Sequence, residues 1–336
     1  MNNKSPIKKL LAVKGMGAAL TAFVGLIIIY VAFGLINPAV FSSNNILNLL
    51  RSMSKYLLIG IAQSYVLITG NIDLSIGSMV AMSAMISATL MTFGVNPFAA
   101  VLVALLCCLV IGVINGILVG KFKLPPFIAT LGTMFVGCGI AYMVNNNRNT
   151  DAIATGVGKE TGDAFQNFFY YGTSAGIYNT FWIAIIMFVI FFFLLSKTRT
   201  GRHIYAIGSN IDAAKLSGVN VVATTTKTYL VSAVCSWVVG LILCAQAGMG
   251  NMEAGNMYEM YGVAAGVIGG VSPLGGTGIL LGTLAGSAVW QTLENGLNMI
   301  GAQVGIQRLV IGIIVVVAVL LDIVLRSGQF TKKKKG

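Results

Sequence analysis

Residues 196–220, SKTRTGRHIYAIGSNIDAAKLSGVN, form a polar connector between two strongly apolar stretches of the chain. The connector carries four basic residues and the single histidine of the sequence, which are Lys197, Arg199, Arg202, Lys215 and His203. Loops on the cytoplasmic side of a membrane are enriched in lysine and arginine. This stretch therefore predicts a cytoplasmic connection between two membrane-spanning helices.

The second half of the connector, residues 210–217, has the pattern of a short helix. Asn210 or Asp212 can cap its start, the sequence AAKL favours helix, and Gly218 can end it. Two interpretations are open at this point. The segment is either a short basic helix that presses against a cytoplasmic partner, or an ordinary positively charged loop.

The chain as a whole has the composition of a membrane protein. Of its 336 residues, 57% are hydrophobic and 9% are charged, whereas soluble domains contain about 25% charged residues. Several apolar stretches of about 20 residues match the thickness of the hydrocarbon core of a bilayer. We therefore expect an all-α polytopic membrane protein that forms a single transmembrane domain over residues 1–336.

The apolar stretches predict about ten transmembrane helices. They lie at residues 16–36, 46–69, 74–91, 98–120, 127–144, 180–195, 226–247, 261–270, 275–293 and 309–325. Between them we expect a cytoplasmic connector at residues 196–222 and an external polar loop at residues 145–179.

The distribution of basic residues orients these helices. With the N-terminus inside, the inner side receives the lysine-rich N-terminus, Lys121, Lys123, the connector and the lysine tail at residues 332–335. The outer side receives five scattered basic residues, which are Arg51, Lys55, Arg148, Lys159 and Arg308. The positive-inside rule then predicts that both termini are cytoplasmic. It also explains the net charge of +12 without nucleic-acid binding.

Signatures of an enzyme are missing from the sequence. It contains no GxxxxGK[ST] pattern for cradling phosphates, and its five cysteines fall within apolar stretches without the spacing of a zinc site. We therefore expect a non-catalytic chain that binds neither a metal nor a cofactor of its own.

Polar residues inside or beside the predicted helices are candidates for lining a transport path. They are Gln63, Asn71, Asp73, Asn115, Gln291, Glu294 and Asn295. A carboxylate within a membrane is a functional candidate, but Asp73 follows a helix break and is better explained as the N-cap of the next helix. For the amides, hydrogen bonds between helices are the simpler explanation. For Glu294 and Asn295, the simpler explanation is a position at the end of a helix, at the membrane surface.

A weak internal similarity connects the two halves of the chain. Residues 69–74, TGNIDL, are similar to residues 269–274, GGVSPL, and each segment is followed by a helix rich in small residues. Asn115-Gly116 is similar to Asn295-Gly296 in the same way. Repeated helices broken by glycine or proline often mark the pathway of a transporter, although glycine-rich apolar sequence also produces such similarity by chance.

Four segments together resemble one known family. They are TGNIDLSIGSM at residues 69–79, LPPFIATLGTM at 124–134, TRTGRHIYAIGSNIDAAKLSGVNV at 198–221 and GVIGGVSPLGGTGILLGTLAG at 266–286. In this order they resemble the membrane permeases of ribose-type bacterial ABC importers, which include permeases for ribose, galactose, xylose and autoinducer-2. The sequence departs from that family after Tyr258-Glu259, where members often have an aspartate and this chain has Met260-Tyr261-Gly262.

The resemblance implies a specific machine in the inner membrane of a bacterium. A second permease copy or a paralogue would complete the membrane part, a tandem-cassette ATPase would bind ATP and Mg²⁺ in the cytoplasm, and a periplasmic or lipid-anchored protein would deliver the sugar. The expected cargo is a monosaccharide such as ribose or galactose. The alternatives are another small polar solute (autoinducer-2, inositol or a nucleoside) or transport by an ATP-independent carrier or channel.

The resemblance also assigns expected roles to residues. Those expected to couple the chain to the ATPase are Arg202, Asn210, Asp212, Ala213, Ala214, Lys215 and Gly218. Those expected to contact the sugar-binding protein are Arg51, Lys55 and Arg308.

Overall fold

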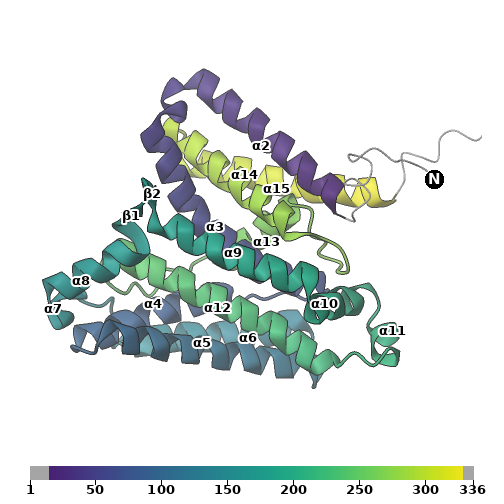
Figure 1. Cartoon of the computed structure of the whole chain (residues 1–336), viewed down its shortest axis with the longest axis horizontal. Coiled ribbons are helices and arrows are strands. Elements are labelled where there is room, and N and C mark those ends of the chain that lie inside the picture. Colours follow the sequence, from purple (N-terminus) through teal and green to yellow (C-terminus); the bar gives the residue numbers. More distant parts are fainter. Residues whose placement is uncertain (1–14, 328–336) are drawn as a thin grey trace, which may run out of the picture.

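The computed structural model describes residues 15–327 as a bundle of helices that run mainly between two ends of the molecule (Figure 1). The helices are α2 (Met16–Ile36), α3 (Ser43–Ile68), α4 (Ile76–Thr92), α5 (Pro97–Gly120), α6 (Pro126–Met143), α7 (Ala154–Val157), α8 (Lys159–Gln166), α9 (Asn179–Lys197), α10 (Arg199–Ser209), α11 (Ile211–Leu216), α12 (Val221–Ala247), α13 (Tyr258–Ile268), α14 (Leu280–Met299) and α15 (Val304–Ser327). Two short turns, η1 (Pro38–Phe41) and η2 (Asn167–Tyr171), and a hairpin of β1 (Thr173–Ser174) and β2 (Ile177–Tyr178) complete the described chain.

Each apolar stretch of the sequence corresponds to one long helix. By length and composition, α2, α5, α6, α9 and α12 are apolar enough to cross a membrane. Local signals place their ends: Asn96 caps α5, whose first residue is Pro97, and Pro126 begins α6. Helix α13 is the exception, because its 11 residues extend only about 16 Å at 1.5 Å per residue.

The core of the bundle is α3, which is surrounded by other helices on all sides. Every residue of α3 from position 56 to its last residue is buried, and it contacts α9, α12, α13 and α14. The outer helices instead expose large apolar side chains, among them Ile27, Leu106 and Phe193. Apolar residues outside, with small and polar residues inside, are the arrangement that a lipid environment favours.

The interior helices approach one another closely at small residues. Helix α4 has buried serines and alanines along most of its length, and Gly240 of α12 lies against the backbone of Val80 and the side chain of Ser83. Ser83 also donates a hydrogen bond of 3.0 Å to the carbonyl of Trp237 in α12. Small residues of this kind let helix backbones pack without bulky side chains between them.

The predicted external loop has more structure than the sequence indicated. Between α6 and α9 it contains α7, α8, η2 and the β1–β2 hairpin, which cover one end of the bundle (Figure 1). Its aromatic residues hold it in place: Phe165 and Tyr170 are buried, and the ring of Tyr178 lies against the Arg51 guanidinium of α3. Polar composition alone did not reveal this packing.

Candidate functional site

Helix α11 projects from the end of the bundle opposite the α7–α8 segment (Figure 1). Asn210 caps it, because the Asn210 Oδ1 accepts hydrogen bonds from the backbone N–H groups of Asp212 (3.0 Å) and Ala213 (2.9 Å). Of the two capping residues that the sequence allowed, Asn210 is therefore the one used. Gly218 follows the helix with a φ of +79°, a conformation that glycine adopts without strain.

The exposed surface of α11 is apolar with a charged border. Leu216 is 91% exposed and Ile211 is 44% exposed, and Asp212 and Lys215 form an ion pair of 3.6 Å beside them. Ala213 is exposed, whereas Ala214 is buried against the bundle. The two alanines expected to contact an ATPase are thus in different environments, and only Ala213 is accessible.

Helix α10 connects α11 to the interior of the bundle. The sequence did not predict this helix, which Thr198 caps by accepting the N–H of Gly201. Tyr205 donates a hydrogen bond of 2.6 Å to the carbonyl of Gly278, and burial raises the pKa of Tyr205 to about 12. The hydroxyl therefore stays protonated, and remains a donor, at physiological pH. Arg202 is exposed on the same helix.

The two similar helix breaks meet beside α10. The N–H of Gly276 donates a hydrogen bond of 2.8 Å to the carbonyl of Ile68, the last residue of α3. Gly208 of α10 packs directly against both of these groups. The similarity of residues 69–74 and 269–274 thus has a spatial counterpart. The second pair of similar residues, Asn115-Gly116 and Asn295-Gly296, is not placed equivalently. Asn295 lies on α14, the helix that follows the second break, whereas Asn115 lies on α5, one helix beyond the α4 that follows the first break.

Asp73 is the centre of a buried hydrogen-bond network at the start of α4. Its Oδ1 accepts from the backbone N–H (2.9 Å) and the hydroxyl (2.6 Å) of Ser75, and its Oδ2 accepts from Ser232 of α12 (2.7 Å). Asn115 donates to Ser75, and Thr133 of α6 donates to Asn115. The network links α4, α5, α6 and α12. The N-cap of α4 is Ser75, so the prediction that Asp73 is the capping residue was wrong by two positions.

Removing the Asp73 carboxylate is expected to destabilise the bundle. Asp73→Ala leaves the Ser75 N–H and the Ser232 hydroxyl buried without an acceptor, which costs about 2–6 kcal/mol in unfolding free energy at 1–3 kcal/mol for each group. Asp73→Asn keeps one acceptor oxygen and should cost less than half as much. Thermal unfolding of the purified protein in detergent measures both, and equal melting temperatures for the two variants would contradict the network.

The other interior amides are placed differently from one another. Asn71 donates a hydrogen bond to Thr69 within the helix break. Gln63 of α3 is fully buried, and within residues 15–327 neither atom of its amide has a hydrogen-bond partner. Gln291 of α14 is also buried, and its Oε1 has no partner in the same part of the chain. Hydrogen bonds between helices therefore explain Asn115 but not Gln63 or the Oε1 of Gln291.

Two of the three basic residues expected to contact a binding protein are engaged within the chain. The Arg51 guanidinium lies 4.5 Å from the ring centre of Tyr170 and 4.1 Å from that of Tyr178. Lys55 donates a hydrogen bond of 3.2 Å to Gln246 of α12. Only Arg308 is exposed. Folding of the aromatic loop over the end of α3 is the reason that Arg51 is covered.

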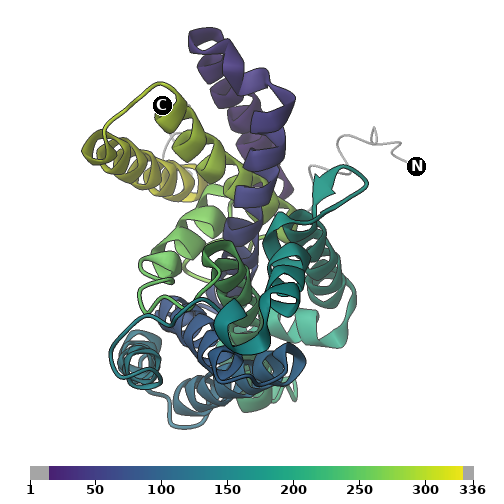
Figure 2. The same cartoon turned by 90° about the vertical axis from the view of Figure 1, so that its left-hand side faces the viewer.

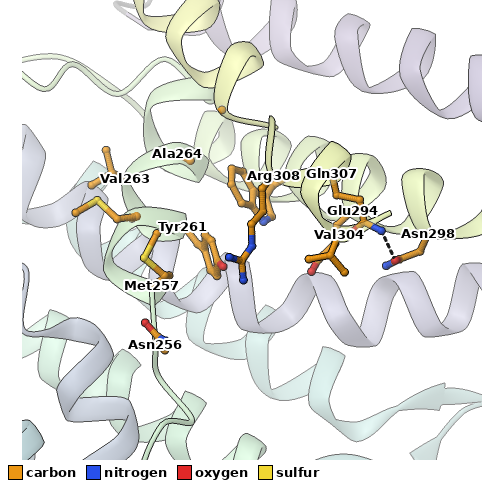
Figure 3. A pocket seen from close by; sticks show the side chains of 13 residues that line it. Asn256, Met257, Tyr261, Val263, Ala264, Glu294, Asn298, Val304, Gln307 and Arg308 are labelled. Carbon is orange, nitrogen blue, oxygen red and sulfur yellow. Dashed lines mark hydrogen bonds between the residues drawn. The ribbon is translucent and has the colours of Figure 1, made fainter. Parts of the chain in front are cut away.

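A cleft of about 850 Å³ lies between α13, α14 and α15 (Figure 3). Its walls include Tyr261, Trp290, Glu294 and Arg308. Tyr56 of α3 donates a hydrogen bond of 2.7 Å to Glu294 Oε2. Asn295 does not reach the cleft, because it exchanges two hydrogen bonds with Asn45. The structure thus brings Glu294 and Arg308 to one site, which their spacing in the sequence did not indicate.

Residues that the sequence did not single out complete both sites. Ser75, Thr133 and Ser232 complete the Asp73 network, and Tyr261 and Trp290 complete the cleft. Hydroxyl residues are common in apolar helices, so only contact across helices distinguishes these from the rest. For Trp290, its place on the same helical face as Glu294 (four residues away) was an available signal.

Comparisons with known proteins agree on one family. Residues 45–319 match the family described as the permease component of the branched-chain amino acid transport system. The chain is 37% identical to the ribose import permease of Bacillus subtilis, over 92% of this chain and 94% of that protein. It is 34% identical to the D-allose transport system permease of Escherichia coli (88% and 89% covered) and 32% identical to the galactose/methyl galactoside import permease of Haemophilus influenzae (89% and 90%). No solved structure matched the chain.

Proposed function

The chain belongs to the family of permease components of the branched-chain amino acid transport system, and from its sugar-transporting relatives we propose that it is the membrane subunit of an ABC importer for a monosaccharide such as ribose or galactose. Permeases of this family are the non-catalytic subunits of their transporters. We propose accordingly that ATP and Mg²⁺ bind to a separate tandem-cassette ATPase.

We propose that ten helices cross the inner membrane of a bacterium and that both termini are cytoplasmic. In support, the first turns of α2 and the last turns of α15 lie at the same end of the bundle as α10 and α11 (Figure 1). This end also carries the basic connector, which the positive-inside rule assigns to the cytoplasm. The opposite end, with the α7–α8 segment and the hairpin, then faces the outside.

In the proposed mechanism, α11 receives the movement of the ATPase. Its exposed Leu216 and Ile211 fit an apolar recess on a partner, and the Asp212–Lys215 pair borders them. Movement passes to α10, whose Gly208 and Tyr205 touch the breaks that follow α3 and α13. A rigid helix in contact with two interrupted helices can shift both of them together, which is the coupling that ATP-driven gating requires.

Two further partners follow from the same proposal. A second copy or a paralogue would pack against this chain in the membrane, and a sugar-binding protein would dock at the outer end near Arg308. Because that binding protein would provide most of the affinity for sugar, the same fold could carry autoinducer-2, inositol or a nucleoside instead. A carrier or channel without an ATPase has no use for the exposed apolar surface of α11.

The observation that carries the proposal is the α10–α11 segment: an exposed apolar helix joined to both helix breaks. The test is to purify the tagged chain from cells that express its neighbouring genes and to reconstitute the complex in proteoliposomes. We expect a tandem-cassette ATPase to co-purify, and uptake of ¹⁴C-labelled D-ribose, D-allose or D-galactose to require ATP and the binding protein. Uptake of these sugars without ATP would contradict the proposal.

A further inference from the structure

The cleft between α13, α14 and α15 combines two surfaces of different chemistry. One wall is aromatic, with the rings of Tyr261 and Trp290 at 5.1 Å and the ring of Tyr56 packed against both. The other surface is polar, with the amides of Asn298 and Gln307 and the guanidinium of Arg308 (Figure 3). Ligand sites of small molecules are apolar cavities of about 300–1,000 Å³ with a few polar groups that orient the ligand.

We infer that this cleft is a site where a monosaccharide binds during its passage through the membrane, a proposal that rests on the function proposed above. A sugar ring has an apolar C–H face, which suits the Tyr261–Trp290 wall, and a rim of hydroxyl groups, which suits the amides and the two charged groups. The carboxylate of Glu294 accepts from Tyr56 through Oε2. The carboxylate also lines the cleft, where it can accept a further hydrogen bond from a sugar hydroxyl.

The position of the cleft fits this role. The chain enters α13 and α15 and leaves α14 at the cleft, while the opposite ends of α13 and α14 join the glycine-rich turn that touches α10. In the proposed orientation the cleft therefore lies in the outer half of the membrane, on the side from which a sugar arrives. Asn256 and Met257 also line a second cavity of about 290 Å³ that reaches Gly77 and Ser78 at the start of α4.

Polar groups without partners continue inward from the cleft. Gln63 lies two turns further along α3 than Tyr56, and Gln291 lies three residues before Glu294 on α14. Among the residues that the structure describes, the buried amide of Gln63 and the buried Oε1 of Gln291 have no hydrogen-bond partners. A buried polar group without a partner costs free energy, and a hydroxyl group of a passing sugar would satisfy it. A lipid acyl chain would not.

The test fills the cleft with a bulky side chain placed on its rim. Val304 is exposed at the start of α15 and lines the cleft, whereas Ile306, also exposed, does not line it. Val304→Trp should lower the rate of ATP-dependent uptake of ¹⁴C-labelled D-ribose into proteoliposomes by about tenfold or more. Ile306→Trp, which adds nearly as much bulk on the opposite face of the helix, should stay within about twofold of wild type. If ribose is not the cargo of the wild type, the same pair is measured with D-allose or D-galactose.

A second variant examines recognition rather than blockage. The double substitution Asn298→Ala with Gln307→Ala removes two amides but adds no bulk, and should raise the apparent KM for the sugar by about tenfold while the ATPase still co-purifies. Unchanged uptake in Val304→Trp, or equal losses in Val304→Trp and Ile306→Trp, would overturn the sugar site. Release of a bound lipid by Val304→Trp with uptake intact would make the cleft a lipid site. Failure of the wild type to couple uptake of any sugar to ATP would instead refute the proposed function.

Discussion

Leu216→Arg is expected to abolish ATP-driven sugar uptake while the protein still inserts into the membrane. The side chain is 91% exposed on α11, so the substitution removes no contact within the bundle. In the proposed complex Leu216 is buried against the ATPase, so the substitution removes an apolar contact from the interface. An unpaired charge in the apolar recess adds a desolvation cost. We expect a loss of about 4 kcal/mol or more in binding to the ATPase, or about a thousandfold in affinity.

The measurement is co-purification of the ATPase together with sugar-stimulated ATP hydrolysis. Lys215→Ala should weaken ATPase binding far less than Leu216→Arg, because its exposed ion pair with Asp212 is worth at most about 1 kcal/mol. Ala213→Arg should reproduce the loss, since Ala213 is exposed on the same helix. Ala214 is unsuitable for this purpose, because it is buried and its replacement would disturb the packing of α11. Normal ATPase binding by Leu216→Arg would show that α11 is not the contact.

Gly208→Ala is expected to lower the stability of the bundle and to disturb its coupling to the ATPase. A Cβ at this position would overlap the carbonyl oxygen of Ile68 and the backbone nitrogen of Gly276. These atoms belong to main chain and cannot rotate away, so α10 must move. Overpacking of this kind costs about 1–3 kcal/mol. The variant should also uncouple ATP hydrolysis from sugar uptake. Helix α11 keeps the exposed surface that binds the ATPase, whereas α10 no longer packs between the two helix breaks and cannot move them.

Gly132→Ala provides the control for Gly208→Ala. Gly132 is also within a helix, α6, but a Cβ there would meet nothing within 4 Å. Alanine is favoured over glycine in a helix interior by about 0.5–1 kcal/mol, so this variant should be as stable as wild type or slightly more stable. Thermal unfolding in detergent gives the comparison. A Gly208→Ala protein with wild-type stability and fully coupled uptake would remove α10 from the proposed mechanism.

Individual residues show how far sequence reasoning reached. The helix at residues 210–217 was predicted from local signals, a capping asparagine and a terminating glycine, and the structure confirms it as α11 within one residue at each end. Asp73 was singled out correctly as a buried carboxylate. Its partner Ser232 lies 159 residues away, and no local pattern connects the two. Arg51 was expected to face a binding protein at the outer surface, but its guanidinium lies against the rings of Tyr170 and Tyr178. These rings come from a loop whose folding depends on α3, so the local sequence did not indicate the contact.

The sequence by itself determined the class of the protein, the positions of its long helices, the extent of α11 and the family. These depend on composition, on stretches long enough for a bilayer and on hydrogen bonds between residues a few positions apart. The tertiary structure alone decided which face of each helix is buried, how α10 contacts both helix breaks, and which side chains form the Asp73 network and the cleft. In these helices polar and small residues are spread over every face, so only the packing of one helix against another selects those that meet.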